Sequence, residues 1–165
     1  MIKSLITSAA LITLIGCGTT EHKQSGVTVP NDITTAQILD EFIQEAHARG
    51  VYPIREYIHV EVVPLVLDRE KVYGACSGYA DNQIIQIKES ITGTKRKITL
   101  FHELGHCVLG KFKHSENPDD IMFSPFTYNA LENWKASVDK LFNNRDLNWT
   151  AITCRNPSED SSKVK

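Results

Sequence analysis

The chain has 165 residues, of which 41% are hydrophobic and 23% are charged, and its formal net charge is −2 at pH 7. This length is sufficient for one domain with a hydrophobic core. Acidic and basic residues are interspersed, so the chain has no basic patch and we expect no nucleic-acid partner.

Residues 1–16 have the pattern of a bacterial export signal, with Lys3 as the positive charge and an apolar run too short to cross a bilayer as a permanent helix. The run ends in Leu14-Ile15-Gly16-Cys17, which resembles the lipobox of bacterial lipoproteins. That resemblance implies that Cys17 is acylated and becomes the new N-terminus. The alternative is an ordinary cleaved signal that happens to precede a cysteine.

Lipidation of Cys17 would anchor the protein stably to a membrane of the cell envelope. Gly18 resembles the sorting pattern of lipoproteins sent to an outer membrane, on its periplasmic or surface side, in a Gram-negative host. Residues 17–32 are polar, and they predict a flexible tether that spans roughly 20 Å.

The domain is predicted to span residues 33–153 and to open with a helix at residues 34–49. Apolar residues recur at helical spacing and predict its buried face: Ile38, Leu39, Phe42, Ile43 and Ala46. Alternating or β-branched residues predict strands at residues 58–63, 71–75 and 83–88, with turn-forming residues at 77–82.

A second helix is predicted at about residues 94–109, and its interior Gly105 costs about 1 kcal/mol relative to alanine. Residues 111–128 show no period and are predicted as a loop. A C-terminal helix is then predicted by apolar residues at helical spacing: Leu131, Trp134, Val138, Leu141 and Phe142. Residues 154–165 are predicted to be a disordered tail.

The pentapeptide His102-Glu103-Leu104-Gly105-His106 lies within the second predicted helix. Residues four apart lie one above the other on a helix, so both imidazoles can bind one metal ion while Glu103 lies beside them. Two histidine ligands and a carboxylate that acts as a general base are what zinc-dependent hydrolysis requires.

A catalytic zinc ion usually has three protein ligands and keeps a fourth position for water. The nearest candidate for the third ligand is His114, which lies eight residues after His106. Zinc also accepts carboxylates, so three acidic residues of the same loop remain alternatives: Glu116, Asp119 and Asp120.

Several features together resemble the metzincin zinc metallopeptidases, especially the matrixin-like branch. They are the pentapeptide, the glycine after the helix, His114 and the segment Asp120-Ile121-Met122-Phe123-Ser124-Pro125. The resemblance covers residues 34–142 in element order and 98–125 in motif. It implies a zincin-like α+β fold, in which a small mixed twisted sheet packs on an N-terminal helix and the active-site helix, with a C-terminal helix. It also implies that Met122 forms a methionine turn beneath the metal.

The resemblance further implies a lipid-anchored endopeptidase whose zinc cofactor is held by His102, His106 and His114. Glu103 would take a proton from the attacking water and deliver it to the leaving amine. The substrate would be an envelope or extracellular protein or peptide, bound along an edge strand that Gln83–Lys88 resembles.

Two other functions remain consistent with the sequence. One is a catalytically inactive envelope lipoprotein that binds zinc or a partner, and the other is a metal-free structural protein with surface histidines. The presence of Glu103 favours the enzyme, and we expect a monomer.

Lipidation of Cys17 would leave three cysteines, and in an oxidising compartment two of them can form a disulfide. We favour Cys76 with Cys107, because both lie in segments expected to build the core. Cys154 would then be unpaired.

Overall fold

A computed structural model describes residues 33–67 and 69–154 of the chain. The predicted signal peptide, the lipidation site Cys17, the tether and residues 155–165 lie outside the described residues. Within the described residues, no helix combines the length and the apolar character needed to cross a membrane.

The described residues form a mixed α+β domain, which agrees with the predicted class at that level. The helices are α1 (Ile33–His47), α2 (Gly93–Cys107), α3 (Trp134–Asn143) and α4 (Leu147–Thr153), with short 3-10 turns at Arg55–Tyr57 and Asn129–Leu131. The strands are β1 (Ile58–Val63), β2 (Gly74–Tyr79) and β3 (Asn82–Lys88).

The three strands form one mixed sheet in the order β1-β3-β2. β2 and β3 pair antiparallel through a tight hairpin in which Tyr79 faces Asn82, whereas β1 pairs with β3 in parallel. Both sides of β3 are therefore occupied, and the prediction that Gln83–Lys88 is the edge strand is wrong. The edge strand on that side of the sheet is β2.

β2 begins three residues later than predicted and includes Ser77–Tyr79, which the sequence assigns to a turn. These residues complete the hairpin ladder with β3, and Gly78 adopts the positive φ of 98° that a residue with a side chain rarely tolerates. Pairing with β3 has overridden their local preference for a turn.

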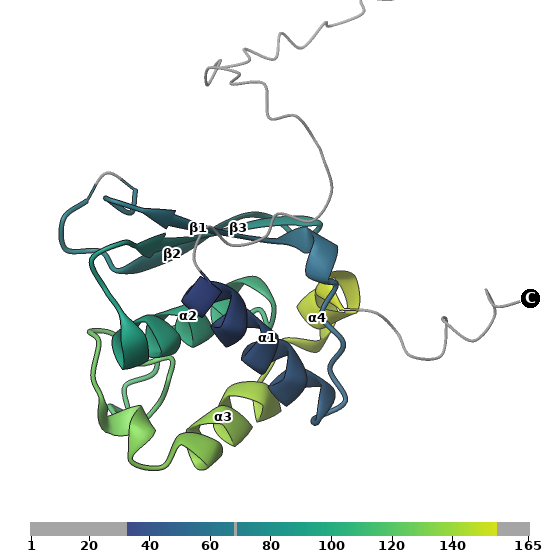
Figure 1. Cartoon of the computed structure of the whole chain (residues 1–165). Helices are drawn as coiled ribbons and strands as arrows, with labels where there is room; N and C mark the ends of the chain where they lie inside the picture. The colour runs from purple at the N-terminus through teal and green to yellow at the C-terminus, as the bar shows by residue number, and fades with distance from the viewer. Residues whose placement is uncertain (1–32, 68, 155–165) are drawn as a thin grey trace, which may run out of the picture.

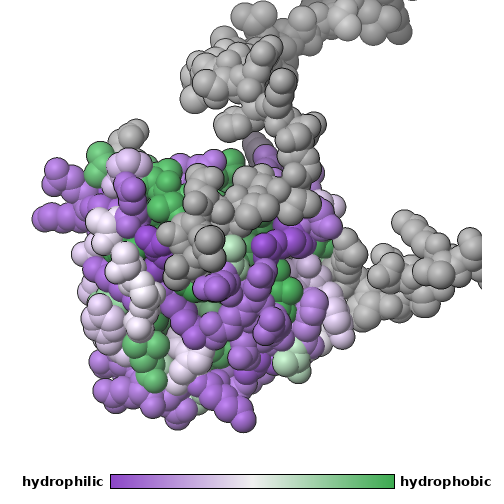
Figure 2. Space-filling view, in the orientation of Figure 1, coloured by the Kyte–Doolittle hydropathy of each residue, from purple (hydrophilic) through white to green (hydrophobic). Residues whose placement is uncertain are grey.

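α1 and α2 pack against one face of the sheet, with α3 further from it (Figure 1). Alternate residues of β3 are buried against these helices: Gln83, Ile85 and Ile87. The core between the helices is aromatic, because the ring of Phe42 lies 5.3 Å from that of Phe101 and 5.2 Å from that of Phe142. The face in Figure 2 is mainly hydrophilic, as expected for a surface that contacts solvent.

The C-terminal region differs most from the prediction. The helix expected after the loop of residues 111–128 begins as a 3-10 turn and becomes α3 only at Trp134. α4 was not predicted from the sequence, and Asp146 caps it by accepting hydrogen bonds from the amides of Asn148 and Trp149. Cys154 forms a β-bridge with Pro53, so the described domain extends one residue beyond the predicted boundary.

Candidate metal centre

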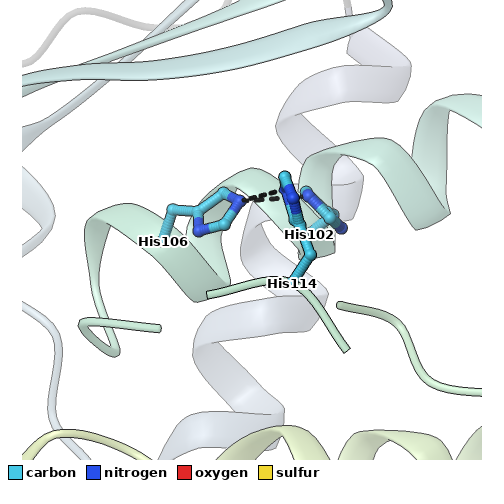
Figure 3. Close-up of side chains that lie close together, drawn as sticks. All are labelled: His102, His106 and His114. Atoms are coloured by element: carbon cyan, nitrogen blue, oxygen red, sulfur yellow. Dashed lines mark hydrogen bonds between the residues drawn. The ribbon is translucent and has the colours of Figure 1, made fainter. Parts of the chain in front are cut away.

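The two histidines of α2 lie on one face of that helix, and the loop after α2 brings His114 close to them. α2 ends at Cys107, two residues earlier than predicted, and Gly110 then takes a φ of 67° that reverses the chain. The amide of Lys111 donates to the carbonyl of Gly105. This turn directs the following loop back beneath α2, where His114 meets the other two imidazoles (Figure 3).

The three rings converge through their Nε2 atoms. Nε2 of His106 lies 3.1 Å from Nε2 of His102 and 3.3 Å from Nε2 of His114. Dashed lines in Figure 3 mark these two pairs. Two nitrogens bound to one tetrahedral zinc ion would be roughly 3.3 Å apart, given zinc–nitrogen bonds of about 2.0–2.1 Å. The spacing therefore suits a shared metal ion.

The other nitrogen of each helix histidine is held by a backbone carbonyl. Nδ1 of His102 donates to the oxygen of Ile121 over 2.7 Å, and Nδ1 of His106 donates to the oxygen of Lys111. Because a carbonyl only accepts, both Nδ1 atoms carry the proton and both Nε2 atoms carry a lone pair. These are the tautomers that bind a metal, and the carbonyls orient the rings as outer partners of metal ligands do.

Burial keeps these rings neutral. It lowers the pKa of His102 to about 4, and it lowers the pKa of His106 as well. Two neutral imidazoles that both present lone pairs cannot satisfy one another by a hydrogen bond. A cation between the two rings could accept both lone pairs. Imidazole nitrogen is a suitable ligand for zinc, copper, iron and nickel ions.

The carboxylates that were alternatives to His114 do not join this group among the described residues. Asp120 is occupied elsewhere: one carboxylate oxygen lies 2.9 Å from Nζ of Lys140, and the other accepts from the amide of Met122. Burial alone would raise the pKa of Asp120, but these contacts lower it overall. Asp119 and Asn117 line a separate surface cavity.

Glu103 lies on α2 between the two histidines and is 6% exposed. Its side chain packs against Gly74 of β2, where an added Cβ would come within 2.8 Å of Cγ and Oε1 of Glu103. Burial raises the pKa of Glu103 to about 7, although a hydrogen bond with the backbone of Cys76 opposes that rise.

Glu103, His102 and His114 line a cavity of about 330 Å³ beside the imidazoles, hereafter the Glu103 cavity. Its other walls come from α2 itself, from the chain entering β2 and from the segment after Met122, and they include Ile98, Tyr73, Pro125 and Phe126. A carboxylate and two imidazole rings that could hold a metal ion thus face the same mostly apolar space. This is an arrangement in which a bound water could be deprotonated next to a substrate.

Met122 lies under α2 at Gly105 and is 2% exposed. A Cβ on Gly105 would come within 2.5 Å of Sδ of Met122 and 3.1 Å of a methyl of Leu141. The glycine in the last turn of α2 therefore has a steric reason, since it allows the Asp120–Met122 turn to approach the helix. The same turn supplies the carbonyl of Ile121 that orients His102.

The sequence analysis missed three contributors to the site. The backbone carbonyls of Ile121 and Lys111 leave no signal in the sequence, because every residue has a backbone carbonyl. Gly74 gave only the weak signal of a glycine in a strand, which often marks a close approach of another group.

A disulfide joins Cys76 to Cys107, the pair favoured from the sequence, while Cys154 is free. It ties the edge strand β2 to the C-terminal end of α2, one residue after His106. No family model, curated protein or solved structure matches the chain.

Replacing Cys76 and Cys107 together by serine should lower the free energy of unfolding by about 2–4 kcal/mol, because the disulfide restricts the unfolded chain. Chemical denaturation monitored by circular dichroism would measure the change. Cys154→Ser serves as the control, with an expected change within about 1 kcal/mol. Equal stability of the double variant and the wild type would contradict a formed disulfide.

Proposed function

We propose that this protein is a zinc-dependent endopeptidase with a zincin-like fold that resembles the matrixin-like metzincins. The observation that carries the proposal is the convergence of three Nε2 atoms next to the buried carboxylate of Glu103. The residues His102, His106 and His114 would hold the zinc ion. The methionine-turn role stays with Met122, which packs under the metal-binding helix.

When bound, zinc supplies Lewis acidity, which polarises a substrate carbonyl and lowers the pKa of a water molecule to around 7. Glu103 then accepts the proton of the attacking water as a general base and returns it to the leaving amine. Its packing between α2 and Gly74 holds the carboxylate in one place, so that little reorganisation is needed during the reaction.

We infer that an extended peptide binds along the edge of β2 that no other described strand pairs with, in place of the predicted β3. Gly74 lies against Glu103 and Cys76 is linked to Cys107 beside His106, so β2 runs past the metal site. An edge strand offers unpaired backbone groups to an added strand, which binds peptides with modest side-chain selectivity. The substrate class is therefore a protein or an unfolded peptide.

The proposal also includes the lipid anchor at Cys17, which would place a monomeric domain at the envelope membrane. Of the two alternatives, the metal-free structural protein is disfavoured because lone pairs of neutral imidazoles would face each other without a cation. The inactive lipoprotein is disfavoured because Glu103 lines the same cavity as two of the imidazoles.

Zinc analysis and peptide digestion test the proposal together. The purified mature protein should contain about one zinc ion per chain and cleave a generic peptide library, and a chelator should abolish cleavage until zinc is restored. Bound zinc without any cleavage would support the inactive lipoprotein instead. A protein that binds no zinc would overturn the proposal entirely.

Gly74→Ala should lower kcat by about 10- to 100-fold without removing zinc. The new Cβ would collide with Glu103 and with a methyl of Thr99, and a displacement of about 1 Å at a reacting group can cost that much. Ser90→Ala, at an exposed position just after β3 that does not line the Glu103 cavity, is the control. Steady-state kinetics with zinc analysis would measure both, and unchanged kcat in Gly74→Ala would show that the position of Glu103 is not critical.

A further inference from the structure

A second cavity of about 310 Å³ lies next to the metal site, and it shares no lining residue with the Glu103 cavity. His106 lines the second cavity, whereas His102 and His114 line the first. The two cavities also follow one another along β2, because Gly74 borders the first and Cys76 to Tyr79 border the second. The metal site lies between them.

Three aromatic residues from different parts of the chain line this second cavity: Tyr79 at the end of β2, Phe112 after α2, and Trp149 on α4. Tyr79 is 81% exposed and Phe112 is 64% exposed. The rings of Phe112 and Trp149 meet edge to face, with centroids 5.2 Å apart. Exposed aromatic groups gathered around a cavity mark a binding site more often than a passive surface.

The cavity is held rigidly. The carbonyl of Cys107 accepts hydrogen bonds from Nε1 of Trp149 (2.6 Å) and from Nε2 of Gln83 (2.9 Å), and the disulfide forms part of the wall. α4 is itself fixed to the end of α2, because Thr153 donates to the carbonyl of Val108. A preformed pocket loses little entropy when a ligand binds.

The chemistry of the lining favours a neutral apolar group. Among the described residues, no aspartate, glutamate, lysine or arginine lines the cavity, and its polar members there are a few hydroxyl, amide and imidazole groups. An aromatic or large aliphatic side chain would pack against Phe112 and Tyr79, whereas a charged side chain would lose hydration without gaining an ion pair.

The proposed reaction indicates which part of a substrate would reach this cavity. If Glu103 returns the proton to the leaving amine, the amine side of the scissile bond would lie toward the Glu103 cavity that it lines. The acyl side would then extend past His106 and along β2 toward Tyr79, two residues that line the second cavity. The second cavity would therefore be reached by residues that precede the scissile bond.

We propose that the cavity of Tyr79, Phe112 and Trp149, hereafter the aromatic subsite, binds an aromatic or bulky apolar side chain on the acyl side of the scissile bond. This inference rests on the proposed peptidase function and adds a substrate class to it. The aromatic subsite makes α4 part of the substrate-binding surface.

Sequencing the products of a peptide-library digest tests the inference. The wild type should prefer aromatic or large aliphatic residues over alanine on the acyl side by about tenfold. Phe112→Ala and Tyr79→Ala should each reduce that preference severalfold, and both side chains are exposed enough for the fold to be retained. Phe126→Ala, in the Glu103 cavity, is the matched control and should change only the preference after the scissile bond.

Peptide binding gives a second readout that does not require turnover. The zinc-loaded Glu103→Gln variant should bind a labelled peptide with a phenylalanine on the acyl side about tenfold more tightly than the matching alanine peptide. Adding Phe112→Ala should remove the difference, as measured by fluorescence anisotropy.

The outcomes separate the two proposals. Cleavage without an acyl-side preference, or with a preference that survives both aromatic substitutions, would overturn the aromatic subsite alone. No cleavage by the zinc-loaded wild type would overturn the peptidase function, and the subsite with it.

Discussion

Glu103→Gln should abolish peptide hydrolysis while the protein keeps its zinc ion and its fold. Glutamine has nearly the same shape as glutamate and fits the space beside Gly74, but it cannot accept a proton from water. Loss of a general base costs about 10²–10⁴-fold in rate. Single-turnover cleavage of a fluorogenic peptide, with zinc analysis of the same sample, would measure both properties.

Glu116→Gln is the matched control for this variant. Glu116 is an exposed acid close to His114 that the sequence left open as a metal ligand, and the described residues do not place it in the histidine group. Its substitution should leave both cleavage and zinc content unchanged. If Glu103→Gln retained the wild-type rate, another group would have to serve as the base.

His106→Ala should lower zinc affinity by at least about a hundredfold, because it removes a metal ligand and not merely an outer partner. Cleavage should fall with it and should return only partly at high zinc concentration. A competition titration with a chromogenic chelator would measure the affinity. His47→Ala is the control, since His47 lies on α1 and packs against Tyr52 away from the site.

The third ligand can be decided with the same titration. His114→Ala should weaken zinc binding as His106→Ala does, whereas Asp119→Ala should not, because only His114 lies with the other two imidazoles. The reverse result would mean that a carboxylate of the loop moves in to bind the metal.

The parts of the site that the sequence predicted are those that depend on local geometry. A spacing of four residues on a helix places His102 and His106 together whatever the rest of the fold does. His114 could be proposed because it is the nearest histidine beyond the glycine that ends the helix, eight residues after His106.

The parts that the sequence analysis missed depend on pairings between distant segments. β3 is central in the sheet because β1, which lies some twenty residues earlier, pairs with it. The residues Gln83–Lys88 alone do not indicate that pairing. α4 is short and carries exposed Leu147 and Ile152, so it lacks the apolar stripe that identifies longer helices. Its position depends on hydrogen bonds from Trp149 and Thr153 to the end of α2.

The backbone carbonyls that accept hydrogen bonds from Nδ1 of His102 and His106 determine which sequence changes this site tolerates. Exchange of the side chain at Lys111 leaves the carbonyl oxygen where it is, so the polarity of that position is free to vary, whereas the side chain of Ile121 is 1% exposed and must stay apolar. Adding or deleting a residue between Gly110 and His114 would instead shift an acceptor and a ligand at once. Relatives of this protein should therefore differ in composition along that stretch but share its length.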